Sequence, residues 1–228
     1  MSKKKIKIYK VRENSDKDYI NKGDRIPALP TRALIIGKSQ LSGKGTLWFN
    51  LIGQKALYKN DFEPDNIYIF SGSKNVDKKL ELLQEYLDIP PSNIFQGYDE
   101  NLLKEVYDMI EEEYIEAKQA KEKPKHSMII LDDLSFGGKL RKKRNGIIAK
   151  MFQNGRHILL STIITAQNYV DIPVSVRNNA TAVYLFQLNR KQLESAIDDH
   201  NFLDRKEYIK IYNEATNHKK HSFLLVNY

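Results

Sequence analysis

The sequence predicts an α/β fold in which helices cover both faces of a mostly parallel central sheet. Short apolar runs typical of buried strands alternate with longer segments of helical periodicity. Two of these runs end in polar motifs, a Gly/Ser/Lys loop after residues 33–37 and two aspartates after residues 127–131. With 228 residues, 41% of them hydrophobic, the chain can bury one sizeable core. We therefore expect one domain at residues 31–228, preceded by a basic arm at residues 1–30.

Local signals place the elements of the first half of the chain. Apolar runs bounded by turn residues predict an edge strand at residues 6–9, strands at residues 33–37 and 67–72, and a short strand at residues 93–96. Helical spacing predicts a helix from Lys44 to about Tyr58, which buries Leu47, Trp48, Leu51 and Ile52. Asp77 and Asp99 have the side chains of N-caps and open two further helices, at residues 77–89 and 99–120.

The second half continues the same alternation. The continuous apolar run at residues 127–131 is typical of a central parallel strand that is buried on both faces. It is followed by a helix at residues 145–154, strands at 158–165 and 181–187, a helical pair at 190–213 and a closing strand at 222–226.

The segment after the first core strand has the composition of a phosphate-binding loop. Its glycines can form an anion-binding nest, and the helix that begins near Lys44 turns its positive end toward the anion. The Lys44 ammonium would then contact the β- and γ-phosphates of ATP. The usual pattern is G-x-x-x-x-G-K-[ST], whereas this loop is one residue longer and Gly45 takes the hydroxyl position. The predicted nucleotide-binding set is Gly37, Lys38, Ser39, Ser42, Gly43, Lys44, Gly45 and Thr46.

Two aspartates follow the strand at residues 127–131. Asp132 lies at its carboxyl end, where open α/β sheets bind ligands, and it would hold Mg²⁺ directly or through water. Thr46 or Ser42 would add a hydroxyl ligand. Asp133 points in a different direction and would align or deprotonate the attacking water. An ordinary Gly/Ser turn and a capping Asp pair are the alternatives, but together the motifs favour one pocket where two neighbouring strands end.

A further strand, expected at residues 67–72, lies between the two motifs in the sequence. This order is typical of a three-layer P-loop NTPase with a RecA-like (ASCE) sheet and differs from that of nucleotide kinases. The strand at residues 158–165 is followed by Gln167, whose amide would lie beside the carboxylates and sense the γ-phosphate or orient water.

Composition restricts the cellular setting. There are no cysteines, which excludes disulfides and thiolate metal sites. No apolar run approaches the roughly 18 residues of a membrane span, and the N-terminus lacks the apolar core of a signal peptide. We expect an intracellular soluble protein that has no membrane partner and is not secreted.

The net charge of +8 favours a polyanionic partner, because cations that neutralise phosphates release condensed counterions. A basic cluster follows the two aspartates within a glycine-flanked loop, and we expect it to contact DNA through Lys139, Arg141, Lys142, Lys143 and Arg144. A solvated basic loop and a nuclear-import tract are the alternatives. Lysines in the first ten residues indicate a solvated arm.

Residues 33–189 resemble the FtsK/HerA superfamily of DNA-pumping ATPases, and most closely the genome-packaging ATPases of poxviruses, giant viruses and virophages. The resemblance is carried by the segments IIGKSQLSGKGT, IILDD, GRH, STIITAQN and DIPVSVRNNAT in this order. The doubled aspartate is similar to the motif of the packaging branch of this superfamily. The phosphate loop departs from the family pattern GKSGSGK[ST]. The resemblance implies hydrolysis of ATP with Mg²⁺ to drive double-stranded DNA into a preformed capsid.

The same resemblance implies a homo-oligomeric ring, a pentamer or hexamer, threaded by DNA at the portal vertex of a viral capsid. Such a protein would act in the host cytoplasm or a viral factory, or in association with the virion. A ring of this type needs a cation delivered across the subunit interface to the γ-phosphoryl group. Arg156 and Arg177 are the candidates, and an internal salt bridge is the alternative for each.

Two other functions remain compatible with the motifs. A small-molecule nucleotide kinase would explain the GKGT ending, but it should carry an arginine-rich acceptor lid and has no use for the basic loop. A non-catalytic P-loop protein that binds DNA or capsid as a structural part would explain the irregular phosphate loop. Transfer of phosphate to a nucleoside monophosphate would identify a nucleotide kinase. Measuring phosphate release with and without duplex DNA distinguishes a non-catalytic protein from an ATPase.

Overall fold

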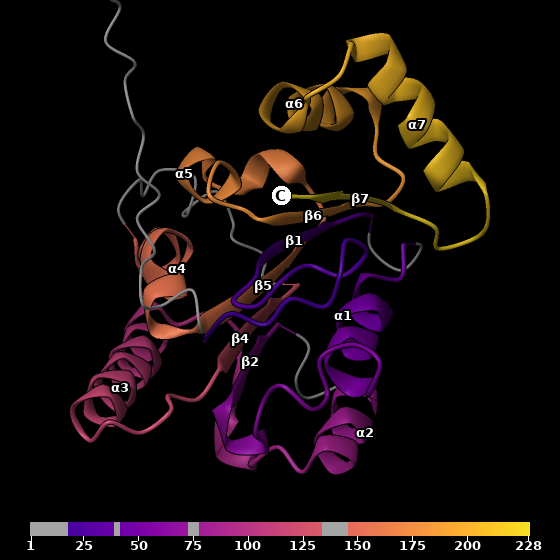
Figure 1. Cartoon of the computed structure of the whole chain (residues 1–228). Coiled ribbons are helices and arrows are strands. Elements are labelled where there is room, and N and C mark those ends of the chain that lie inside the picture. The colour runs from indigo at the N-terminus through magenta and orange to yellow at the C-terminus, as the bar shows by residue number, and fades with distance from the viewer. Residues whose placement is uncertain (1–17, 39–41, 73–77, 134–145) are drawn as a thin grey trace, which may run out of the picture.

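The structure is a computed structural model that describes residues 18–38, 42–72, 78–133 and 146–228. A seven-stranded sheet forms its centre, in the order β3-β2-β4-β5-β1-β6-β7 (Figure 1). Neighbouring strands are parallel except for β6 and β7. The strands are β1 (Arg32–Ile36), β2 (Ile67–Ser71), β3 (Ile94–Gln96), β4 (Ser127–Asp132), β5 (Leu160–Ala166), β6 (Ala182–Leu185) and β7 (Leu224–Asn227).

Helices cover both faces of this sheet. The helices are α1 (Lys44–Gly53), α2 (Lys78–Leu87), α3 (Glu100–Gln119), α4 (Ile147–Asn154), α5 (Val174–Arg177), α6 (Arg190–His200) and α7 (Arg205–Asn217). One core cluster packs α1 and α2 against one face of the sheet, and a second packs the other helices against the opposite face (Figure 1). The predicted three-layer α/β fold is confirmed.

The burial of the strands follows from their sequences. In β1, Leu34 and Ile36 face the core cluster of α3 to α7, while Ala33 and Ile35 face that of α1 and α2. Every residue of β4 is buried. Strands buried on both faces need continuous apolar runs, which is the pattern that predicted them.

The sheet order places β5 between β1 and β4. Ile163 of β5 pairs with Ala33 on one side and with Ile130 on the other. The RecA-like order is therefore confirmed, since a strand separates the phosphate-loop strand from the carboxylate strand. The expectation that the two motif strands are neighbours is wrong. All three strands nevertheless end at the same edge, because they are parallel.

Some predicted boundaries need correction. The first helix ends at Gly53 and not at Tyr58, because the Tyr58 backbone N–H donates to the Leu51 carbonyl at 2.9 Å and closes a turn. The strand expected from residue 158 begins at Leu160, after a 3-10 turn and a left-handed residue at Leu159 (φ 54°). Asp99 caps α3 as expected, since its carboxylate accepts two backbone N–H groups. The proposed strand at residues 6–9 and the Asp77 cap lie outside the described residues.

The described part of the expected arm, residues 18–30, packs against the domain. Leu29 is fully buried and forms a β-bridge with Ile20. Asp18 accepts from the Lys118 ammonium at 2.8 Å, which joins this segment to the end of α3. Among the described residues, none of the helices combines the length and apolar composition that a membrane span requires.

Candidate active site

Three polar segments meet at the carboxyl edge of the sheet. The phosphate loop follows β1, the two aspartates end β4, and Gln167 follows β5. Side-chain hydrogen bonds connect α1, β5 and Gln167 to the two aspartates. This edge is where open parallel sheets bind their ligands.

Two glycines of the phosphate loop are required by its shape. A Cβ at Gly37 would lie 2.6 Å from the Ser42 Cβ and 2.9 Å from the Phe186 Cβ, which leaves no room for a side chain. Gly43 precedes α1 with φ 87°, a left-handed conformation that favours glycine. A Cβ at Gly43 would also lie 3.2 Å from the His221 Nδ1. The backbone of the loop therefore packs closely against Phe186 at Gly37 and against His221 at Gly43.

The Lys44 side chain is folded into the loop. Its Nζ donates to the carbonyl of Gly37 at 2.7 Å and to that of Lys38 at 3.4 Å, and only 7% of the residue is exposed. Burial lowers the pKa of Lys44, whereas the nearby carboxylates of Asp133 and Asp132 act to raise it. The Lys44 ammonium and both aspartates therefore lie at the same edge of the sheet.

Asp132 is held by two donors from different elements. The Trp48 indole N–H and the Thr165 hydroxyl both donate to its Oδ1, each at 2.9 Å. Trp48 lies one turn after Lys44 on α1, so both residues point from the same side of the helix toward β4. The carboxylate is 7% exposed and has a fixed orientation. Neither donor role was predicted.

Asp133 and Gln167 form a hydrogen-bonded pair. The Gln167 Nε2 donates to the Asp133 Oδ1 at 3.0 Å, and the Asp133 backbone N–H donates to the Thr165 hydroxyl at 2.8 Å. Asp133 has φ 44°, a conformation that non-glycine residues rarely adopt outside functional or tightly constrained sites. Asp133 is exposed, whereas Asp132 is buried, and the role of Asp133 in acting on water remains a prediction.

The oxygen ligands available at this edge suit a Mg²⁺ ion that is bound together with a nucleotide. Mg²⁺ in nucleotide sites is held by one or two carboxylates, water and the phosphates themselves. Accordingly, the described residues contain no group of three or more His, Asp or Glu side chains that could hold a metal without a nucleotide. The Ser42 hydroxyl donates to the Lys38 carbonyl at 2.7 Å and is tied to the loop, while Thr46 is exposed on the first turn of α1. Thr46 and Asp132 remain the predicted metal ligands.

Comparison with known proteins then defines the family. The family model for the poxvirus A32 protein matches residues 24–227. The chain belongs to the poxvirus A32 protein family. The resemblance to viral packaging ATPases drawn from the motifs is thus confirmed at the level of family.

Individual proteins and solved structures also match the chain. Protein 075L of invertebrate iridescent virus 6, described as uncharacterized, is 31% identical over 103 residues, which are 45% of this chain and 38% of that protein. The genome packaging NTPase B204 from Sulfolobus turreted icosahedral virus 2, in complex with ATP-gammaS, has a TM-score of 0.54 and 16% identity over 87% of this chain and 92% of B204. EssC (ATPases 2 and 3) from Geobacillus thermodenitrificans has a TM-score of 0.58 and 17% identity over 76% of this chain and 35% of EssC. These structural matches establish the shared fold.

The two candidate arginines of this A32 family chain lie together, away from the phosphate loop. They line a cavity of about 410 Å³ with Arg32, which opens β1 at the edge of the sheet opposite the phosphate loop. Arg177 forms an ion pair with Asp199 and lies 4.8 Å from the centre of the Tyr169 ring. Arg156 is exposed and has no carboxylate partner among the described residues. Neither arginine can serve the nucleotide site of its own chain from this edge.

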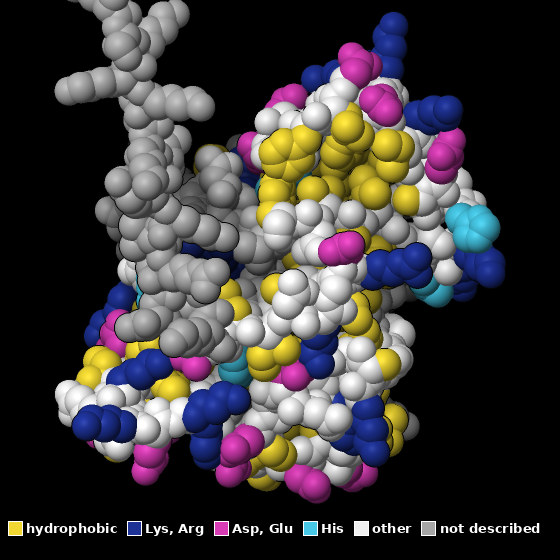
Figure 2. Space-filling model, in the orientation of Figure 1, with side chains coloured by type: hydrophobic (Ala, Val, Ile, Leu, Met, Phe, Trp, Pro, Cys, Tyr) yellow, Lys and Arg dark blue, Asp and Glu magenta, His cyan; other side chains and the backbone are white. Residues whose placement is uncertain are grey.

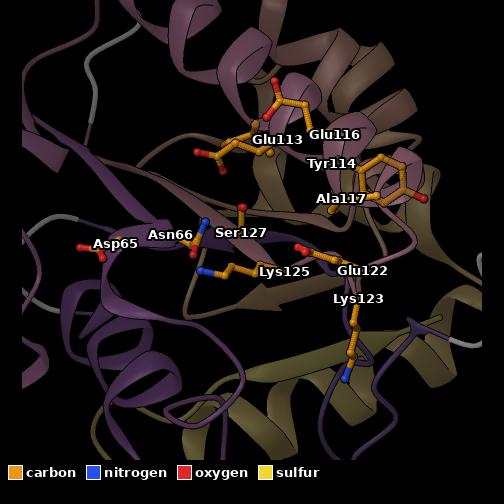
Figure 3. A pocket seen from close by; sticks show the side chains of 12 residues that line it. Asp65, Asn66, Glu113, Tyr114, Glu116, Ala117, Glu122, Lys123, Lys125 and Ser127 are labelled. Atoms are coloured by element: carbon orange, nitrogen blue, oxygen red, sulfur yellow. The ribbon is translucent and has the colours of Figure 1, made fainter.

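The remaining predicted residues are not at this site. Ser39 and the basic cluster of Lys139, Arg141, Lys142, Lys143 and Arg144 lie outside the described residues. A cavity of about 470 Å³ lies between α3 and the start of β4, where Figure 3 shows the side chains of Glu113, Glu122 and Lys125. It contains none of the predicted site residues, and it opens at the edge where β4 begins.

Replacing Trp48 with phenylalanine is expected to raise the Mg²⁺ concentration for half-maximal nucleotide binding about ten-fold. Phenylalanine fills part of the space of the buried indole, but Asp132 loses a donor that orients it, and groups that orient metal ligands typically affect metal affinity by this amount. Mg²⁺ titration of nucleotide binding measures the effect. Tyr58→Phe is the matched control, because it removes a buried donor to Pro27 in the same layer, far from Asp132. An unchanged Mg²⁺ requirement in Trp48→Phe would contradict the role.

Proposed function

We propose that this chain is the ATPase of a viral DNA-packaging motor, which couples hydrolysis of Mg-ATP to translocation of double-stranded DNA into a preformed capsid. The observation that carries the proposal is the meeting of the phosphate loop, Asp132 and Asp133 at one edge of a RecA-like sheet, where α1 and β5 donate hydrogen bonds to Asp132. Membership of the A32 family supports it. The B204 protein, a genome packaging NTPase, shares the fold. The motor would act in the host cytoplasm or a viral factory, at the portal vertex of the capsid.

The residues divide the reaction between them. Lys44 would leave the loop carbonyls and bind the β- and γ-phosphate oxygens, which offer it full negative charge. Asp132, oriented by Trp48 and Thr165, would hold Mg²⁺, which when bound neutralises charge on the phosphates. Asp133 would align or deprotonate the attacking water, and Gln167 would hold the Asp133 carboxylate in position and sense the γ-phosphate.

The position of the arginines supports a ring. A head-to-tail ring joins two different surfaces of neighbouring subunits, here the phosphate-loop edge of one and the opposite edge of the next. The exposed Arg156 would reach the γ-phosphoryl group of the neighbour, while Arg177 has a structural role in its ion pair with Asp199. The mass of the assembly with Mg-ATP and duplex DNA tests this directly. A species of five or six chains is expected, and a monomer under these conditions would overturn the motor.

Substitutions of the two arginines should affect different properties of the protein, turnover for Arg156 and stability for Arg177. Arg156→Ala is expected to leave the melting temperature unchanged and to lower the turnover of the assembled ring by at least about a hundred-fold. Arg177→Ala should lower the free energy of unfolding of the monomer by about 2 kcal/mol, which lowers the melting temperature by about 6 °C. The reason is that the mostly buried Asp199 carboxylate loses its ion-pair partner. Thermal unfolding and phosphate release measure the two effects. Normal turnover in Arg156→Ala would remove Arg156 from the interface.

Neutralising the basic cluster at residues 141–144 is expected to weaken stimulation by DNA without lowering basal hydrolysis. Four lost phosphate contacts should reduce the slope of log affinity against log salt by about 3 to 4. Fluorescence anisotropy of labelled duplex DNA at several salt concentrations measures the slope. A variant with all four residues as lysine is the matched control and should keep it. If the neutral variant keeps the slope of the native protein, this cluster is not in the DNA path.

A nucleotide kinase is less compatible with the fold. The strand β5 separates the phosphate-loop strand from the carboxylate strand, an order that kinases of this type do not use. Transfer of phosphate from ATP to a nucleoside monophosphate would nevertheless reverse this conclusion. A non-catalytic role is opposed by the close grouping of Lys44, Asp133 and Gln167, since binding alone does not require a residue that acts on water.

A further inference from the structure

A second cavity adjoins the phosphate loop on the side away from the aspartates. Its volume is about 170 Å³, and it lies between the loop after β1 and the turn that connects α7 to β7. The lining residues come from four segments of the chain, Lys38 and Ser42, Phe186 and Gln187, Thr216, and residues 219–222. None of the sequence motifs predicted that the α7–β7 turn would reach the phosphate loop.

The α7–β7 turn has internal hydrogen bonds and contacts the loop through His221. The Ser222 backbone N–H donates to the Lys219 carbonyl and the Lys219 backbone N–H to the Ser222 hydroxyl, both at 3.1 Å. His221 adopts a left-handed conformation (φ 67°) that brings its imidazole against Gly43. Figure 2 shows lysine and histidine side chains gathered at this end of α7, on the right of the view. The α7–β7 turn therefore forms one side of the cavity, next to the phosphate loop.

The size and the lining of the cavity suit part of a nucleotide. Pockets that take up whole ligands of this kind measure about 300 to 1,000 Å³, so 170 Å³ has room for a base and not for a triphosphate as well. One wall is the buried Phe186, whose ring packs against Phe223 with the ring centres 5.4 Å apart. The stems of the lysines and the His221 ring offer further flat or apolar surface to an aromatic base. The cavity borders the phosphate loop at Lys38 and Ser42, next to the place expected for the triphosphate.

Gln187 is a polar residue in the lining of the cavity, and its hydrogen bonds define the orientation of its side-chain amide. Its Nε2 donates to the Asn217 Oδ1 at 2.9 Å and to the Thr216 carbonyl at 3.4 Å. Because a backbone carbonyl can only accept, this contact fixes which end of the amide is the donor. The Oε1 is then the acceptor end, and it has no hydrogen-bond partner among the described residues.

We propose that this cavity receives the purine base of the nucleotide and that the Gln187 Oε1 accepts a hydrogen bond from the exocyclic amino group of adenine. Guanine presents a carbonyl oxygen at the same position, which would face the Gln187 oxygen without a proton between them. Gln187 thus selects ATP over GTP. The inference rests on the proposed function, since it assumes that the triphosphate lies on Lys44.

Equilibrium binding of four probes with Mg²⁺ tests the inference. The probes are ATP, GTP, purine riboside triphosphate, which lacks the amino group, and inorganic tripolyphosphate, which lacks the nucleoside. The native protein should bind ATP about three- to ten-fold more tightly than GTP or purine riboside triphosphate, the usual net contribution of one hydrogen bond. In Gln187→Leu the three nucleotides should bind about equally, while tripolyphosphate should bind as in the native protein.

The outcomes separate the two proposals. If Gln187→Leu keeps the preference for ATP over GTP, or if the native protein does not distinguish ATP from purine riboside triphosphate, the role of Gln187 is overturned. The second comparison uses the native protein and so does not depend on the folding of the variant. If the native protein does not bind tripolyphosphate, the assignment of the phosphate loop itself fails. Gln84→Leu on α2 is the matched control and should change none of the four affinities.

Discussion

Lys44→Ala is expected to abolish nucleotide hydrolysis, with turnover reduced by at least about a hundred-fold. The Lys44 ammonium lies in the phosphate loop and is buried there, whereas the Lys38 side chain in the same loop is exposed. The loss should appear in steady-state phosphate release and in single-turnover hydrolysis. Thermal unfolding of the variant is needed alongside, because Lys44 also donates to the Gly37 carbonyl and contributes to the shape of the loop.

The control for this variant is Lys210→Ala, which removes one exposed positive charge from α7 and should leave turnover unchanged. The comparison separates the loss of one particular ammonium from a general loss of positive charge. Full turnover in a folded Lys44→Ala protein would show that the nucleotide is bound elsewhere.

Asp133→Asn is expected to leave ATP bound but uncleaved, with turnover reduced by about 10² to 10⁴. An amide at this position can still accept from Gln167, so the local structure is preserved, but it cannot take a proton from water. Asp132→Asn should instead weaken Mg²⁺-dependent binding of ATP, since Asp132 is the carboxylate held for the metal by Trp48 and Thr165.

Equilibrium binding and single-turnover hydrolysis together distinguish the two aspartates. Tight ATP binding with no cleavage is the pattern expected for Asp133→Asn, and weak binding is the pattern expected for Asp132→Asn. If Asp133→Asn cleaves ATP at the native rate, or if the two patterns are exchanged, the assigned roles are wrong.

The fold was largely predictable because its signals are local. A parallel sheet buried on both faces needs continuous apolar runs, and the run at residues 127–131 is one of them. The helix end at Gly53 was missed because apolar residues continue beyond it, and the turn that stops the helix is closed by a hydrogen bond from Tyr58 to Leu51. Propensity alone does not report such a turn.

The contacts within the site were less predictable. The donor groups of Trp48 and Thr165 meet on Asp132 although Trp48 is 84 residues away in the sequence, and only the order of the strands brings them together. The spacing of Lys44 and Trp48, one helical turn apart, was the single local signal that they share a side of α1. The approach of His221 to Gly43 had no local signal, because it depends on how the last helix returns to the sheet.

The central claim is that one pocket at the edge of the sheet hydrolyses a nucleotide for DNA transport. The most direct measurement is phosphate release by the native protein from Mg-ATP, with and without duplex DNA, and with EDTA as the metal-free control. The account predicts release that requires Mg²⁺ and rises several-fold with duplex DNA. A folded native protein that releases no phosphate in either condition would contradict it.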